Sequence, residues 1–278
     1  MTAQSLCKSI LLSASMLLAL GSTWSASAAT DNVDALADKV IQQLESSGSL
    51  DSALDRAIER RIKRENDARE KTAQDERTRQ NQLAEIARKV DPQRDHIWGP
   101  AGARISVIVY SDMECPFCKQ FSGVPEAAAA KVGQQVNVVW RHYPLQFHRP
   151  NALKEAHAAE CVARQAGNEG FFAFANEVLK RSAGNGKGVP DGDPGVLAIA
   201  RQSGAKDDKK FKNCLGEERT IKAVDEDMQD GINAGITGTP GVIVRDNVSG
   251  HSGLVGGAIP VETLEAQIRG LLTESQGR

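Results

Sequence analysis

The feature that most constrains how this chain folds is a pair of cysteines, Cys115 and Cys118, placed where a strand pattern gives way to a helix pattern. The β-branched run 104–110 is typical of a buried strand, and a helix pattern follows over about 116–132. Residues 135–141 then predict a second strand, which completes a β-α-β unit. We therefore expect a mixed α/β fold with both cysteines at the start of its first helix.

The chain after this unit predicts a helical block, a hairpin and a closing helix. Residues 151–235 have a helical pattern, which is interrupted at four places: Gly167, the loop 184–194, Gly204 and Gly216. Two short apolar runs, 241–245 and 252–255, predict the hairpin, and residues 260–272 predict the last helix. This order inserts a mostly helical segment, about 150–235, into one small α/β sheet.

The two cysteines have the spacing and the position for thiol–disulfide chemistry. Free backbone N–H groups and the helix dipole at a helix N-terminus favour a thiolate, so we expect Cys115 to be exposed and to be the attacking sulfur. Cys118 lies one turn further on and is expected to resolve the mixed disulfide. Pro116 suits the first turn because it lacks the N–H that has no partner there, and Phe117 completes the motif.

The same cysteine pair has two alternative interpretations, half of a zinc knuckle or an inert disulfide. A zinc knuckle needs a second Cys-x-x-Cys or a histidine pair at ligand spacing. The other cysteines stand alone, and His142 and His148 have no matching pair. The sequence therefore predicts no metal centre and no cofactor, and these two histidines are expected in loops or at the surface.

The first residues have the pattern of a secretory signal. An apolar run over 10–20 follows Lys8, and residues 26–28 (Ala-Ser-Ala) fit the small-x-small cleavage pattern. We expect 1–28 to be a signal peptide that is removed on export to the periplasm or the exterior; an uncleaved anchor or a buried helix is the alternative. The apolar run is shorter than the ~20 residues that span a membrane, and no later run is long enough.

The next segment is rich in helix-forming residues, with a turn predicted at 46–49. It carries two apolar stripes at four-residue steps: Leu36, Val40 and Leu44, then Leu50, Leu54, Ile58 and Ile62. A short amphipathic helix is not stable alone, so we expect 29–62 to be a helical oligomerisation segment. Residues 31–62 of two or three chains would bury one another; folding back onto the α/β domain is the alternative.

Residues 63–92 are predicted to link this segment to an α/β domain over 93–278. Charged residues of both signs dominate the start of the linker, which is either a solvated helix held by ion pairs or a flexible tether. The whole chain has a formal net charge of −2 and only 7 Phe, 2 Tyr and 3 Trp. These values argue against a protein that binds nucleic acid or coats an anionic membrane.

A second motif, 237–240 (Thr-Gly-Thr-Pro), precedes the predicted hairpin. Proline cannot donate a hydrogen bond to a β-ladder, so its place at the start of a strand needs a reason. A cis Thr239–Pro240 bond would turn the chain and leave the backbone groups of Thr239 free to pair with an incoming peptide. An ordinary trans proline is the alternative, and the local sequence alone favours it.

Taken together, these residues resemble the thioredoxin superfamily, and in particular its DsbA-like branch. The resemblance covers about 93–275 and includes the strand that ends in Tyr-Ser-Asp-Met-Glu, the Cys-Pro-Phe-Cys motif, the helical insertion and the Gly-Thr-Pro sequence. It implies a thioredoxin-like fold in which Cys115 is the nucleophile, Cys118 the resolving thiol and Pro240 cis and facing the disulfide. It also implies a protein thiol–disulfide oxidoreductase that acts on cysteines of other proteins and is reset by a redox partner protein.

Two residues depart from the strong oxidants of that family. Phe117 stands where those oxidants carry a thiolate-stabilising histidine, and Thr239 resembles the disulfide isomerases, whereas the dedicated oxidase carries valine. The N-terminal helical segment resembles the oligomerisation stalks of DsbC-type isomerases and of the trimeric suppressor-of-copper-sensitivity proteins. We therefore expect an isomerase or reductase; a DsbA-type dithiol oxidase, or a copper-binding thiol protein of the envelope, is the alternative.

Two further pairs of residues are candidates for roles near the motif. Many DsbA-like proteins bridge a pair such as Cys161 and Cys214, which lie in two predicted helices of the insertion; two free buried thiols are the alternative. Asp112 and Glu114 precede the motif, and we expect them to form a proton relay. The alternative is that they are solvated or helix-capping acids. The glycines of the insertion predict a flexible loop: Gly184, Gly186 and Gly188.

Overall fold

The computed structural model describes residues 27–276, which divide into two compact units between Glu70 and Lys71. We call 27–70 the leader unit and 71–276 the sheet unit. Nearly all of the predicted signal peptide lies outside the described residues. Among the helices described, none is long and apolar enough to cross a membrane.

The leader unit is helical. Helix α1 spans Ser27–Ser46, and α2 spans Ser49–Ile86, so that the last turns of α2 belong to the sheet unit. Gly48 between the two helices has a φ of +64°, which glycine adopts without a steric cost. The turn predicted at 46–49 is therefore confirmed, and the charged stretch that follows is a helix rather than a flexible tether.

The apolar stripes of the leader unit are exposed. Their side chains keep between 43% and 62% of their surface: Leu36, Val40, Leu44, Leu54, Ile58 and Ile62. Apolar surface in water costs about 25 cal/mol per Å², so a continuous exposed row is typical of an interaction surface.

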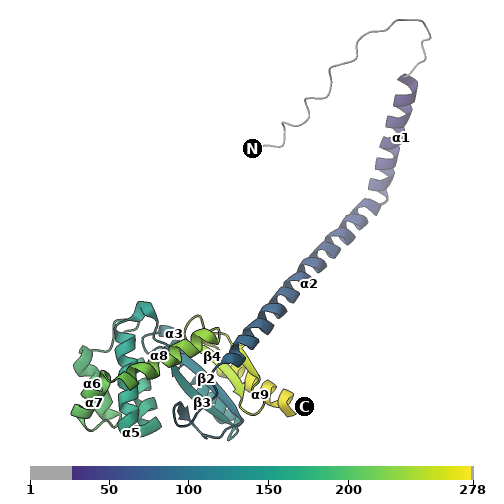
Figure 1. Ribbon diagram of the computed structural model, residues 1–278. Coiled ribbons are helices and arrows are strands. Elements are labelled where there is room, and N and C mark those ends of the chain that lie inside the picture. The colour runs from purple at the N-terminus through teal and green to yellow at the C-terminus, as the bar shows by residue number, and fades with distance from the viewer. Residues whose placement is uncertain (1–26, 277–278) are drawn as a thin grey trace, which may run out of the picture. The chain divides into compact units, whose positions relative to one another are not determined.

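A five-stranded sheet forms the centre of the sheet unit (Figure 1). In spatial order the strands are β1 (His96–Trp98), β3 (Val136–His142), β2 (Ile105–Ser111), β4 (Gly241–Asp246) and β5 (Ser252–Val255). Strand β2 runs parallel to β3 and antiparallel to β4, and every residue of β2 is buried. The two predicted strands and the predicted hairpin are confirmed. Strand β1 was not predicted, because three residues are too few to show a period.

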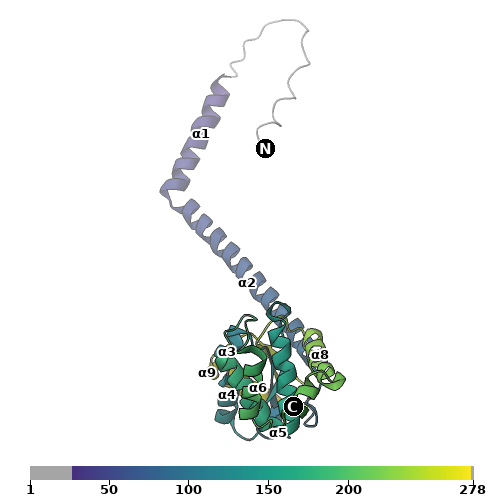
Figure 2. The ribbon, with the colours of Figure 1, turned by 90° about the vertical axis from the view of Figure 1, so that its left-hand side faces the viewer.

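Helices cover both faces of the sheet: α3 (Pro116–Phe121), α4 (Val124–Val132) and α9 (Val261–Gln276) on one face, and α8 (Glu218–Asn233) on the other (Figure 2). The side chains of β2 alternate between two cores because successive residues of a strand point to opposite faces. Val107 and Val109 pack in the core under α4 and α9. Ile108 and Tyr110 pack in the core closed by the end of α2 and the chain after α8.

The predicted helical insertion is confirmed. Before α8 it consists of the 3-10 turn η1 (Gln146–His148) and three helices, α5 (Asn151–Arg181), α6 (Gly192–Gln202) and α7 (Asp208–Leu215). Phe171, Phe174 and Phe211 are buried in a third core between these helices. A disulfide joins Cys161 on α5 to Cys214 on α7, so these two cysteines are not free thiols.

Two predicted boundaries were wrong. The sheet unit begins at Lys71 and not at 93, and Ala84 and Ala87 near the end of α2 are buried in it. Alanines bury little surface among charged neighbours, so this face of the helix produced no apolar stripe. The helix predicted over 116–132 is two helices, α3 and α4, separated at Gly123, whose φ is +80°.

Candidate active site

The cysteine motif and the Thr-Pro motif meet because their strands are neighbours. In the antiparallel pair of β2 and β4, Tyr110 lies opposite Gly241. The chain that leaves β2 toward Cys115 and the chain that enters β4 from Pro240 therefore lie at the same end of the sheet. The Thr239–Pro240 bond is cis, and the Cys115 sulfur lies 3.3 Å from the backbone oxygen of Thr239.

Cys115 is the N-cap residue of α3. Its backbone is extended, with φ −82° and ψ 122°, and Pro116 is the first helical residue. The expectation that Cys115 is exposed was wrong, since the residue keeps only 4% of its surface while the Thr239 backbone contacts its sulfur. Phe117, two residues further along the motif, keeps 60%. The motif thus combines a covered sulfur with an exposed aromatic ring that offers a contact surface to another molecule.

The two sulfurs of the motif have opposite acidities. Hydrogen bonds from the Cys118 thiol and from the N–H groups of Cys118 and Phe117 lower the pKa of Cys115 to about 5, although burial opposes the shift. Burial raises the pKa of Cys118 well above its ordinary value. At neutral pH the pair therefore holds a thiolate at Cys115 and a thiol at Cys118, which is the division that nucleophilic attack followed by resolution requires.

Asp112 anchors the loop behind the motif. Both of its carboxylate oxygens are engaged: Oδ1 accepts a hydrogen bond from the Glu114 N–H at 2.8 Å, and Oδ2 accepts one from the Leu145 N–H at 2.9 Å. Nδ1 of His148 lies 2.7 Å from the same Oδ2. The alternative of a solvated acid is wrong, because Asp112 is buried. These contacts support a role in positioning the loop.

Glu114 holds the glycine loop of the insertion next to the motif. Its carboxylate accepts hydrogen bonds from the Ser182 hydroxyl and from the Gly188 N–H, the latter at 2.9 Å. Its backbone oxygen accepts a third from the Asn185 N–H at 2.7 Å. Glu114 is fully buried and not solvated. The loop predicted to be flexible is therefore hydrogen-bonded to the residue that precedes Cys115.

Two buried acids near the motif were missed by the sequence analysis. Burial, and next the charge of Glu114, raise the pKa of Glu155 to about 9, so Glu155 is uncharged at neutral pH. Burial also raises the pKa of Glu126 on α4, which lines a cavity of about 20 Å³ together with Cys118. That volume is enough for one water molecule. A signal for Glu155 was present, since it lies on the alanine face of α5 that packs inward.

The two histidines expected in loops or at the surface are buried. His148 forms its pair with Asp112 under the motif. His142 is the last residue of β3 and keeps 1% of its surface. The error has one cause in both cases: each ring is covered by elements that are distant in the sequence.

The comparisons with known proteins agree with this geometry. The family model described as Thioredoxin matches residues 91–268. The chain belongs to this thioredoxin family. The crystal structure of Pseudomonas aeruginosa DsbA2 is similar at a TM-score of 0.56 and 31% identity, and the match covers 64% of this chain and 94% of that one. The predicted thioredoxin-like fold and the DsbA-like branch are thus confirmed.

Two other similarities are narrower. A linker-deletion variant of Proteus mirabilis ScsC covers 91% of this chain and 100% of its own, with a TM-score of 0.52; at 20% identity it shows the fold alone. Among curated proteins, the Na(+)/H(+) antiporter NhaA 1 of Mycolicibacterium gilvum is 39% identical over 80 residues, which are 29% of this chain. The matched segment is only 13% of the length of that antiporter.

Proposed function

We propose that the protein is an exported thiol–disulfide oxidoreductase that isomerises or reduces disulfides of other proteins. The observation that carries this proposal is the pair of sulfurs with opposite acidities, placed against the cis Thr239–Pro240 bond. A helix N-terminus, a thiolate and an adjacent thiol are together the requirements for disulfide exchange. The exposed ring of Phe117 and the backbone of Thr239 are positioned to receive the substrate chain.

The reaction proceeds by two exchanges. The Cys115 thiolate attacks one sulfur of a substrate disulfide, which forms a Cys115–substrate bond and releases the other substrate sulfur as a thiolate. Cys118 then loses its proton through the cavity that it shares with Glu126 and attacks Cys115. This step forms the Cys115–Cys118 disulfide and releases the second substrate sulfur. In isomerisation a different thiolate of the substrate attacks the substrate sulfur of the mixed disulfide before Cys118 does. This step forms a new substrate disulfide and releases the Cys115 thiolate without net oxidation.

A dithiol oxidase is the second candidate. Thr239 resembles the residue of the isomerases, and Phe117 lacks the hydrogen bond of the histidine in the strong oxidants. A Cys115 pKa of about 5, however, stabilises the reduced form and makes the enzyme disulfide more oxidising. The reduction potential of the Cys115/Cys118 couple, measured against glutathione, decides between them. A value near that of protein disulfide isomerase supports the first candidate, and a value near that of DsbA supports the second.

Export and self-association belong to the same proposal. We infer that 1–28 are removed as a signal peptide, that the protein acts in the periplasm or outside the cell, and that a redox partner protein resets it. The disulfide between Cys161 and Cys214 supports an oxidising compartment. The exposed stripes support a dimer or trimer formed through residues 31–62.

Substitution of the two sulfurs tests the central claim. We expect Cys115→Ser to abolish both insulin reduction and the refolding of a scrambled substrate, because no thiolate remains to attack. Cys118→Ser should instead accumulate mixed disulfides that non-reducing electrophoresis detects. The control is Ser249→Ala, an exposed position in the turn between β4 and β5, which should leave both activities unchanged. Wild-type activity in Cys115→Ser would refute the assignment.

A further inference from the structure

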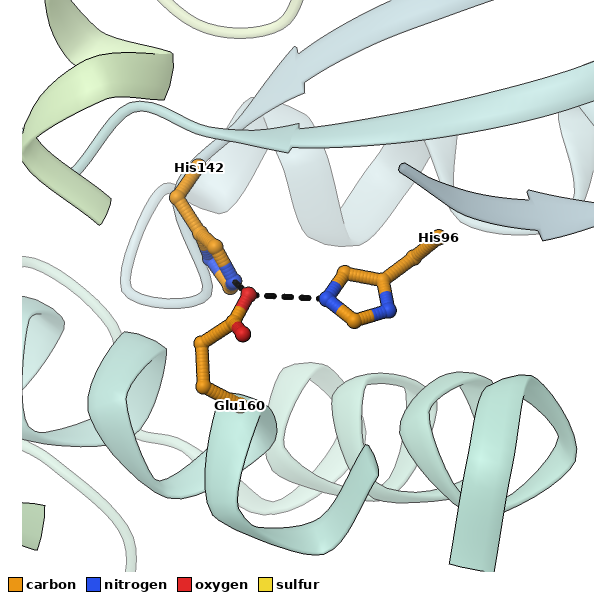
Figure 3. A group of neighbouring side chains, drawn as sticks. All are labelled: His96, His142 and Glu160. Carbon is orange, nitrogen blue, oxygen red and sulfur yellow. Dashed lines mark hydrogen bonds and ion pairs between the residues drawn. The ribbon is translucent and has the colours of Figure 1, made fainter. Parts of the chain in front are cut away.

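Three side chains from distant parts of the sequence converge between the sheet and the insertion. His96 begins β1, His142 ends β3 and Glu160 lies on α5. Nε2 of His96 lies 2.7 Å, and Nε2 of His142 3.2 Å, from the same Oε1 of Glu160 (Figure 3). One ligand atom from each of the three residues lies within 4.8 Å of the other two.

One atom of this cluster lacks a hydrogen-bond partner. Nε2 of His142 is buried and, within the described part of the chain, forms no hydrogen bond. Its approach to Glu160 at 3.2 Å is an ion-pair contact only. The ring keeps 1% of its surface and points at the Glu160 carboxylate (Figure 3). A buried polar atom without a partner is costly, and a ligand that binds there removes the cost.

Outer contacts hold both rings in place. The His96 ring stacks on Phe171 with centroids 3.6 Å apart, and its Nδ1 donates to Oδ1 of Asn168 at 3.3 Å, which turns Nε2 toward Glu160. Nδ1 of His142 accepts a long hydrogen bond of 3.4 Å from Nε1 of Trp140. The contact of His96, in which the second ring nitrogen donates to a fixed acceptor, is typical of histidines that bind metal ions.

We propose that His96, His142 and Glu160 form a binding site for one divalent first-row transition-metal ion, with Zn²⁺ as the representative ion. Two imidazoles and one carboxylate are a known Zn²⁺ donor set and leave one tetrahedral position for water. Imidazole nitrogen suits Zn²⁺, Cu²⁺ and Ni²⁺, whereas Ca²⁺ and Mg²⁺ prefer sites made of oxygen alone. The site is separate from the cysteine motif and needs no thiolate.

A bound ion connects parts of the sheet unit that are distant in the sequence. It takes one ligand each from β1, β3 and α5. Because the three ligands meet only in the folded chain, the ion stabilises the folded state by mass action.

The test is a Zn²⁺ titration of the full chain with the Cys115–Cys118 pair oxidised, so that the thiols are not available as ligands. We expect isothermal titration calorimetry to give one ion per chain, and thermal unfolding to give a higher Tm with Zn²⁺ than without it. Glu160→Gln and His96→Gln should each weaken binding by roughly tenfold or more, since each removes one of three ligands. Co²⁺ should give a visible spectrum without the charge-transfer band of thiolate ligands.

The matched control is His157→Gln. His157 lies on the same helix as Glu160 and also has a buried Nε2 without a hydrogen-bond partner in the described residues, but it is outside the cluster. This variant should bind Zn²⁺ like the wild type. Far-UV circular dichroism reports whether each variant is folded, and the stoichiometry of Zn²⁺ binding by the wild type needs no variant. Absence of Zn²⁺ binding by the folded wild type, or binding that Glu160→Gln and His96→Gln leave unchanged, overturns the proposal.

Discussion

The leader unit and the sheet unit use their apolar residues in opposite ways. In the sheet unit, the strand residues Val107 and Ile108 are fully buried, each in a different core. In the leader unit, Leu36 and Leu54 keep 62% and 57% of their surface. One unit is therefore a closed core that carries the reacting groups. The other is a helical surface whose stability depends on a partner, for which we propose further copies of the chain.

The largest expected effect is the loss of assembly and isomerase activity when the leader unit is deleted. Deletion of 29–70 should produce a monomer that keeps insulin reduction within about twofold but loses isomerase activity, because isomerisation depends on the assembly. Light scattering and the two assays measure this. Deletion of 29–90 should in addition lower the Tm, because it removes the buried Ala84 and Ala87 and the ion pair of Arg88 with Asp95. A full-length protein that is already monomeric contradicts the oligomer proposal.

The disulfide should contribute to the stability of the sheet unit and not to self-association through the leader unit. Cys161 and Cys214 are separated by 53 positions, and closing a loop of that length restricts the unfolded chain by about 4 kcal/mol on the entropic model. We expect Cys161→Ser with Cys214→Ser to lower the free energy of unfolding of the sheet unit by about this amount, measured with urea. The association constant of the full chain should stay unchanged. Loss of association would show that the two units are not independent.

The reactivity of Cys115 should have the same pH profile in the full chain and in the 29–70 deletion. With a pKa of about 5, its alkylation rate should rise tenfold per pH unit below that value and level off above it. The lowered pKa also stabilises the folded state of the reduced protein against unfolding. This contribution to the free energy of unfolding grows as the pH rises from about 5 toward 9.0, the ordinary pKa of cysteine, and it disappears as the pH falls through about 5. Stopped-flow alkylation and urea unfolding, with Cys115→Ser as reference, measure both.

The smallest effect is expected from a single position in a leader stripe. Val40→Asp should weaken self-association about tenfold or more, since burying one valine contributes roughly 1.5–3 kcal/mol. Gln42→Asp is the matched control on the same helix, because it adds the same charge outside the stripe. Sedimentation equilibrium measures both variants. Equal self-association of the Val40→Asp and Gln42→Asp variants would mean that the stripe is not the interface.

Much of the fold follows from local patterns. The β-branched runs predicted β2 and β3, the glycine breaks predicted the helices of the insertion, and the cysteine motif predicted the start of α3. The resemblance to the family rested on the Cys-Pro-Phe-Cys motif and the Gly-Thr-Pro sequence within this order of elements. Local patterns failed for β1, which is too short for a period, and for the boundary at Lys71, where small side chains are buried.

The surroundings of the site required the three-dimensional structure. The sequence by itself predicted which sulfur attacks, because the helix N-terminus that favours a thiolate depends on residues within one turn of each other. Only the tertiary structure decided how acidic Cys115 is, that Glu126 lies near Cys118, and that His96 and Glu160 approach His142. Acidity and ligand geometry depend on distances of a few ångströms between groups from separate elements, and the packing of the sheet against the insertion sets those distances.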